Sequence, residues 1–183
     1  MIFSMYDSSI PHLKHMLSSL SAIIEKSAVY ATDKKIEPSV LVSSRLYPDM
    51  FALAKQIQIA TDQAKACAAR LAGIEIPIFD DNETTLGDLQ ARIAKTIAFL
   101  DSITAEQIDG SENRDIVFSV HGTPMEFKGR DYLLEWLFPN FYFHLTTAYN
   151  ILRHNGVDIG KKDFLGVDEQ LRRIPIDKQV RQV

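Results

Sequence analysis

Apolar residues recur at intervals of three and four along four long segments of the chain, which predicts four amphipathic helices. The segments are residues 9–32, 50–72, 86–102 and 129–156. Pro11 suits the first turn of the first helix, because an N–H at that position would have no partner within the helix. Gly73 is placed to end the second helix. Thr85 and Asp88 have the spacing of a capping box at the start of the third.

The period changes between residues 115 and 128. Ile116, Phe118 and Val120 alternate with other positions, which is typical of a strand, and the HGTP sequence that follows favours a turn. We therefore expect a β-hairpin in this region. Pro139 interrupts the last helical segment, so we expect that helix to be kinked or split there. Four long helices with a small inserted hairpin predict an all-α four-helix bundle.

Composition narrows the classes of function. The formal net charge of the 183-residue chain is −4 and its basic residues do not cluster, which argues against non-specific nucleic-acid binding. The chain has no uninterrupted apolar run of membrane-spanning length and no signal-peptide pattern. Cys67 stands alone, so it forms no internal disulfide, and we expect it to be a buried, inert thiol. We expect a cytoplasmic protein that binds neither nucleic acid nor a membrane.

Two histidines of the last helix, His144 and His154, are candidates for chemistry. Several apolar positions fall within about 60° of His144 on a helical wheel, namely Leu133, Leu137, Phe141, Ala148 and Ile151. We therefore expect His144 in the middle of the buried face. His154 lies roughly 15 Å further along the axis, too far to share a metal ion with it. Neither Asn140 nor Ala148, four residues from His144, is a strong ligand. Neither a metal site nor a cofactor is predicted.

Three interpretations of His144 stay open. It is a core residue bonded to a neighbour, it lines a polar pocket for a small molecule, or it ligates a metal with unusual partners. Those partners would be Asp62 or Gln58 and a histidine of the first helix. In a pocket, His144 would be accompanied by Tyr47, Gln58, Asp62, Asn140 and Tyr149, although Tyr149 points about 140° away. If the pocket is catalytic, His144 is the acid–base candidate, because imidazole titrates near neutral pH.

Several stretches of the chain occur together in a fixed order. They are SMYDSSIP, RLYPDMFALAKQIQIATDQAKACAARLAG, DLQARIAKTIAFL, PNFYFHLTTAYNILRHNG and VDIGKKDFLG. This series resembles the signature of an uncharacterised bacterial domain-of-unknown-function (DUF) family in the DinB/YfiT-like superfamily. The resemblance covers about residues 3–166 and implies one DinB-like bundle domain over 1–166, usually a homodimer. Residues 167–183 lie beyond it and are expected to form a C-terminal extension.

The superfamily also bears on the site. Many of its members bind a divalent metal through three histidines, one on the second helix and two, four residues apart, on the fourth. Some are thiol-dependent transferases or isomerases. His144 matches a fourth-helix position, but Ala148 stands where its partner would be, and the second helix has no histidine. The resemblance thus implies the fold and argues against the usual metal site.

We expect a small-molecule-binding bundle with a pocket around His144. One alternative is a non-catalytic structural or stress-related homodimer. Another is a metal-dependent hydrolase or thiol transferase with atypical ligands.

Overall fold

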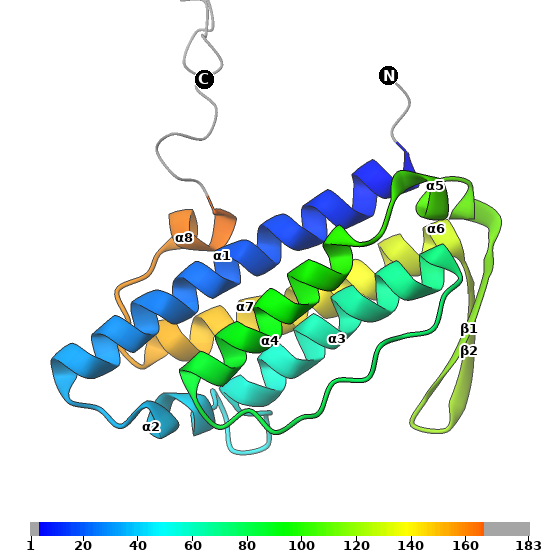
Figure 1. Ribbon diagram of the computed structural model, residues 1–183. Helices are drawn as coiled ribbons and strands as arrows, with labels where there is room; N and C mark the ends of the chain where they lie inside the picture. Colours follow the sequence, from blue (N-terminus) through cyan, green and yellow to red (C-terminus); the bar gives the residue numbers. More distant parts are fainter. Residues whose placement is uncertain (1–3, 167–183) are drawn as a thin grey trace, which may run out of the picture.

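Four long helices form the body of the protein, as their apolar periodicity predicts. A computed structural model describes residues 4–166 (Figure 1). The long helices are α1 (Met5–Lys34), α3 (Leu53–Ala72), α4 (Leu86–Asp101) and α7 (Phe138–His154). Shorter elements connect them: α2 (Pro38–Ser43), α5 (Ala105–Ile108), η1 (Ser111–Asn113), α6 (Gly129–Asp131), η2 (Tyr132–Leu137) and α8 (Lys161–Leu165). The predicted all-α bundle is confirmed; the predicted extension at 167–183 lies outside the described residues.

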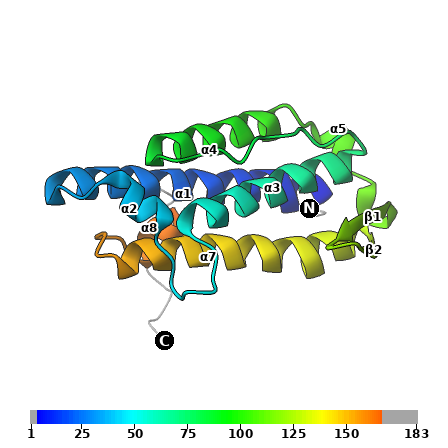
Figure 2. The same ribbon diagram turned by 90° about the horizontal axis from the view of Figure 1, so that it is seen from below.

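The helices are arranged with α4 and α7 on opposite sides of α1 and α3 (Figure 2). The α3–α4 loop, residues 73–85, runs back along α3, so α3 and α4 point the same way while α1 and α7 point the opposite way (Figure 1). Side chains from all four helices are buried in one core, including Leu13, Leu17, Ile24, Leu53, Ile57, Leu89, Ile93, Phe141 and Leu145. Among the described residues, no helix is both long and apolar enough to cross a membrane.

Helix α1 begins earlier than predicted. Pro11 lies inside the helix and not in its first turn, so that prediction is wrong. The helix starts at Met5 because Ser4 accepts a hydrogen bond from the N–H of Asp7 at 3.1 Å. Asp109 accepts another from the N–H of Tyr6 at 2.9 Å. These acceptors satisfy N–H groups that have no partner within the helix, and the bundle tolerates the hydrogen bond that Pro11 cannot make.

The fourth helical segment is not split at Pro139. Its backbone stays helical from η2 into α7, with right-handed helical angles at Leu137 and Phe138, and only the winding changes there. Pro139 lies in the first turn of α7 and donates no backbone hydrogen bond to the turn before it. Directly before α7, η2 is a π-helix over Tyr132–Leu137, a rare winding that was not predicted. The π-helix changes the rotation per residue, so positions before and after Pro139 do not follow one helical wheel. A single helical wheel drawn through Pro139 therefore misplaces His144 relative to Leu133 and Leu137.

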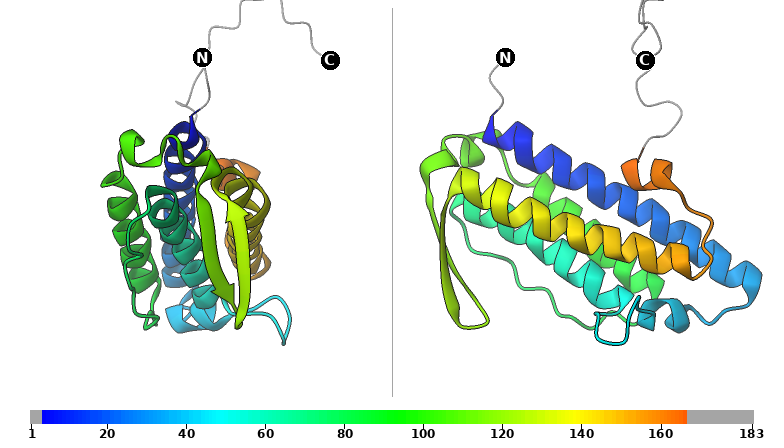
Figure 3. Two further views of the ribbon diagram at one scale, coloured as in Figure 1. Left: turned by 90° about the vertical axis from the view of Figure 1, so that its right-hand side faces the viewer. Right: turned by 180° about the vertical axis from the view of Figure 1, so that it is seen from behind.

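A β-hairpin covers one end of the bundle, as predicted (Figure 3). Strand β1 (Asp115–Val120) pairs antiparallel with β2 (Thr123–Lys128), and the two-residue turn places both His121 and Gly122 at positive φ. Phe118 and Phe127 of the hairpin lie against Trp136 at ring-centroid distances of 5.4 and 6.0 Å. The hairpin therefore shields part of the aromatic surface of the last helical segment.

Candidate functional site

His144 of α7 meets a glutamine of α3. Its Nδ1 is 2.7 Å from Oε1 of Gln56, whose side chain is almost fully buried. Gln56 Nε2 donates to the backbone oxygen of Phe51 at 3.1 Å. A carbonyl oxygen only accepts, so the amide NH₂ must face Phe51 and the amide oxygen must face His144. The imidazole therefore carries its hydrogen on Nδ1, and Nε2 keeps a lone pair.

The surroundings of His144 keep the imidazole neutral. Partial burial lowers the pKa of His144 below its ordinary value of 6.5, because a charged imidazolium loses solvation there. The ring of Phe143 stands edge-to-face with His144 at 5.2 Å between centroids, and 56% of Phe143 is exposed. The site thus offers a hydrogen-bond acceptor beside an exposed aromatic surface.

His144 does not lie in the middle of the buried face, contrary to the prediction. It is partly exposed, whereas the buried residues of α7 are Phe141, Leu145, Thr147, Ala148, Ile151 and Leu152. At about 100° per residue, His144 lies roughly 40° from the centre of that set. The predicted face included Leu133 and Leu137, which lie before Pro139 in the π-helix. Because a π-helix turns by a different angle per residue, these two positions do not mark the buried face of α7.

The structure does not bring the predicted pocket residues together around His144. Gln58 and Asp62 of α3 face α4, because Gln56 and Gln58 lie about 200° apart on the helix. Gln58 Nε2 donates to Glu83 at 2.8 Å, and Asp62 Oδ1 accepts from Arg92 at 2.8 Å. Two of the predicted residues therefore belong to a different cluster.

Tyr47 and Tyr149 lie apart as well, whereas Asn140 lies one turn before His144 on α7. Tyr47 is 65% exposed in the connection between α2 and α3. Asn140 donates to the backbone oxygen of Trp136 at 2.7 Å. The ring centroid of Tyr149 lies 5.8 Å from the ring centroid of Phe164 of α8. The partner of His144 is Gln56, which was not among the predicted site residues. The signal available in the sequence was a glutamine on the apolar face of α3.

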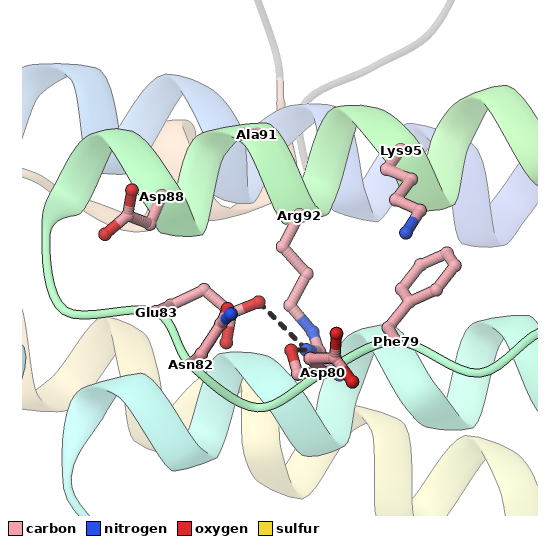
Figure 4. Close-up of a pocket in the computed structure, with 8 residues that line it drawn as sticks. All are labelled: Phe79, Asp80, Asn82, Glu83, Asp88, Ala91, Arg92 and Lys95. Atoms are coloured by element: carbon pink, nitrogen blue, oxygen red, sulfur yellow. Dashed lines mark hydrogen bonds and ion pairs between the residues drawn. The ribbon is translucent and has the colours of Figure 1, made fainter.

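A buried arginine, Arg92, organises the second cluster (Figure 4). Its side chain is 1% exposed and extends from α4 toward the α3–α4 loop. It donates to Thr61 Oγ1 at 2.8 Å, to Asp62 Oδ1 at 2.8 Å, and to Glu83 Oε1 at 2.9 Å. It also donates to the backbone oxygen of Asp80 at 3.0 Å. These bonds fasten the loop to α3 and α4.

A hollow of about 400 Å³ opens beside this cluster, and Phe79 forms part of its wall. The ammonium groups of Lys65 and Lys95 each lie 4.0 Å from the centroid of the Phe79 ring. Because Arg92 and Glu83 bond to protein groups, we interpret the cluster as structural. Arg92 stands between the apolar residues Leu89 and Ile93, which was the signal available in the sequence.

Cys67 is fully buried in α3, as predicted. Burial raises the pKa of its thiol far above the ordinary value. The thiol therefore stays protonated and does not act as a nucleophile at neutral pH.

A family model described as a domain of unknown function (DUF1993) matches residues 5–165. The chain belongs to the DUF1993 family. It is also similar to a DinB family member protein from Shewanella denitrificans, whose crystal structure was determined at 1.83 Å resolution. The two chains are 41% identical, with a TM-score of 0.80, over 89% of this chain and 92% of that one. No curated protein matches the chain. The resemblance to a DUF family of the DinB-like superfamily is thus confirmed.

The residues of this DUF1993 protein do not fit a three-histidine metal site. Ala148, one turn from His144, is buried and offers no ligand atom, and α3 presents Gln56 to His144. Within residues 4–166, no three His, Cys, Asp or Glu side chains are grouped to hold a metal ion.

The histidines of α1 contact other parts of this DUF1993 protein. His12 Nε2 contacts the hydroxyl of Tyr142. The ring centroid of His12 lies 5.4 Å from the ring centroid of Phe138. His15 Nε2 lies 2.8 Å from the backbone oxygen of Leu165. These contacts do not assemble the atypical ligand set of His144, Asp62 or Gln58 and an α1 histidine.

We expect the DUF1993 protein to lose stability as the pH falls from about 7 to 5, and His144→Gln to remove part of that loss. The pKa of His144 is lower in the folded state than its ordinary 6.5, so the unfolded chain binds the proton first. The contribution of His144 is therefore fully present above pH 6.5 and is lost as the pH falls through the folded pKa. Urea unfolding across this pH range measures it.

The matched control is His154→Gln, which replaces an exposed histidine of the same helix. It should leave the pH dependence of stability close to that of the wild type. An unchanged slope in His144→Gln would contradict the expectation. Burial also lowers the pKa of His12, aided by the charge of His15, so some pH dependence should persist in every variant.

Proposed function

We propose that this DUF1993 protein binds a small molecule beside the contact between α3 and α7, with Nε2 of His144 accepting a hydrogen bond from it. The observation that carries the proposal is the 2.7 Å hydrogen bond from His144 to Gln56. It directs the single N–H of the neutral imidazole toward the protein. The remaining lone pair lies on a partly exposed ring.

The chemistry of the surroundings narrows the class of ligand. An acceptor nitrogen calls for a donor such as a hydroxyl, thiol or amine. The exposed ring of Phe143, beside His144, offers an apolar surface to the rest of the ligand. The proposed ligand is therefore a small molecule with one hydrogen-bond donor and an apolar or aromatic body.

The same geometry supports acid–base chemistry on the bound donor. A neutral imidazole with its Nδ1–H held by an acceptor is arranged to take a proton at Nε2. Gln56 would act as a positioning residue, since it sets the tautomer without touching the ligand. Acid–base chemistry of this kind requires that the ligand binds, so the experiment below measures binding.

A thermal-shift screen of small phenols, alcohols and thiols tests the proposal. A ligand at ten times its Kd should raise the melting temperature of the wild type by about 3–5 °C. The same compounds should give no shift with His144→Ala and the full shift with His154→Ala. Gln56→Leu should weaken binding, because the imidazole loses the acceptor that sets its tautomer.

The structural alternative makes the opposite prediction for the same variants. If His144 only completes the fold, His144→Ala lowers the melting temperature and no compound distinguishes it from the wild type. Nitrogen chemical shifts of His144 give a second readout. They should show Nδ1 protonated and Nε2 bare, with Nε2 changing when a ligand binds.

A further inference from the structure

A second hollow lies between α1 and the connection from α7 to α8. The chain leaves α7 and passes the C-terminal half of α1 before it enters α8 (Figures 1 and 3). The hollow has a volume of about 550 Å³, within the range of small-molecule pockets. Its lining residues are Ala22, Glu25, Lys26, Val29, Tyr30, Asp33, Val157 and Asp158. None of them belongs to the His144 site or the Arg92 cluster.

One wall of the hollow is fixed by a contact between Tyr30 and the α7–α8 connection. The hydroxyl of Tyr30 donates to the backbone oxygen of Asn155 at 3.1 Å. Gly156 has a φ of +92°, and a Cβ at this position would lie 2.6 Å from the hydroxyl oxygen of Tyr30. Only a glycine combines this backbone with so close an approach. The position of Tyr30 is therefore defined by the fold.

The surface inside the hollow is largely apolar. Val157 is buried at its base, and Val29 of α1 is 58% exposed. Ala22 and the ring of Tyr30 continue this surface along one side of α1. An exposed valine beside an aromatic ring favours an apolar group of a ligand.

The charges around the hollow are mostly negative. Glu25, Asp33 and Asp158 contribute carboxylates, and the single lysine, Lys26, is bound to Asp163 at 2.5 Å. Asp158 lies 3.6 Å from an exposed arginine, Arg153. The ion pairs formed within residues 4–166 include neither Glu25 nor Asp33. Unpaired carboxylates beside an apolar surface attract cations and repel anions.

We propose that this hollow binds a small organic ammonium ion with an apolar body. Glu25 and Asp33 lie roughly 12 Å apart along α1, so the ammonium group lies near one of the two carboxylates. The apolar body lies on Val29, Val157 and the ring of Tyr30. A cation near the face of the tyrosine ring gains a further attraction. The proposal stands apart from the His144 site and does not depend on it.

The test compares phenethylammonium with its uncharged analogue 2-phenylethanol at low ionic strength. Binding is followed by the methyl NMR signals of Val29 and Val157 as each probe is titrated into the full-length protein. Phenethylammonium should shift both signals and bind more tightly than 2-phenylethanol. Added salt should weaken the binding of the ammonium ion only.

A double variant, Glu25→Gln with Asp33→Asn, removes the unpaired carboxylates from the exposed surface without touching the core. Its Kd for phenethylammonium should rise about threefold to tenfold. The matched control, Glu112→Gln with Glu135→Gln, removes two exposed carboxylates elsewhere and should leave the Kd unchanged.

Four results would overturn the proposal. They are no binding of phenethylammonium, equal affinity for 2-phenylethanol, an unchanged Kd in the double variant, and shifts confined to other methyl groups. A fifth result would show that the hollow has a different occupant. If the Val29 and Val157 signals move with protein concentration in the absence of probe, a second copy of the chain covers the hollow and the ammonium assignment is wrong.

Discussion

Arg92→Met is expected to lower the free energy of unfolding by about 3–5 kcal/mol, and the melting temperature by roughly 10 °C. The substitution removes the cation but leaves its partners in place. Glu83 is nearly buried, and its carboxylate would keep only the hydrogen bond from Gln58. Thr61, which is buried, would lose the hydrogen bond that it accepts from Arg92. An uncompensated buried charge accounts for most of the cost.

Urea unfolding of the variant and the wild type measures this effect, with Arg130→Met as the control. Arg130 is an exposed arginine whose ion pair joins it to the next residue, Asp131, and its loss should change stability by less than about 1 kcal/mol. The free energy of unfolding of Arg92→Lys should fall between those of the wild type and Arg92→Met. One ammonium group keeps the charge but cannot replace a planar group that bonds several acceptors.

The source of the cost is tested by adding Glu83→Gln to Arg92→Met. This second change neutralises the carboxylate that Arg92 leaves behind, so part of the lost stability should return. If the free energy of unfolding of Arg92→Met lies within about 1 kcal/mol of the wild-type value, the Arg92 cluster does not fasten the α3–α4 loop.

Phe141→Ala is expected to cost about 3–5 kcal/mol, the usual range for removing a buried phenylalanine. Phe141 is fully buried on the face of α7 that enters the core. Its removal forfeits apolar burial and leaves a cavity that the long helices can close only in part. The same unfolding measurement detects the loss.

The matched control is Phe143→Ala, two residues further along the same helix. Phe143 is mostly exposed, so its removal should change stability by no more than about 0.5 kcal/mol. It should, however, weaken a ligand bound at His144. Equal destabilisation by the two substitutions would show that the orientation assigned to α7 is wrong.

The local signals in the sequence predicted most of the fold. Thr85 and Asp88 form the capping box at the start of α4, and Gly73 ends α3 with a φ of +70°. The hairpin formed over the strands that alternation predicted. Each of these features depends on residues a few positions apart, so neighbouring residue types are sufficient to specify it.

The partners of polar residues could not be predicted in this way. His144 and Gln56 are 88 positions apart, and Arg92 meets Asp62 across a separation of 30. Whether a polar residue on an apolar stripe finds a partner depends on which face of the next helix lies opposite. The π-helix before Pro139 adds to this difficulty, because it changes the rotation of α7 relative to the segment before it.

The amino-acid sequence by itself determined the number of long helices, the hairpin and the resemblance to a DinB-like bundle, because periodicity and turn chemistry are local properties. Only the tertiary structure decided that Gln56 holds His144, and that Gln58 and Asp62 belong to Arg92. It also showed that Tyr30 and Gly156 shape a second hollow. These contacts join residues that are distant in the chain, and only the packing of the helices brings them within hydrogen-bonding distance.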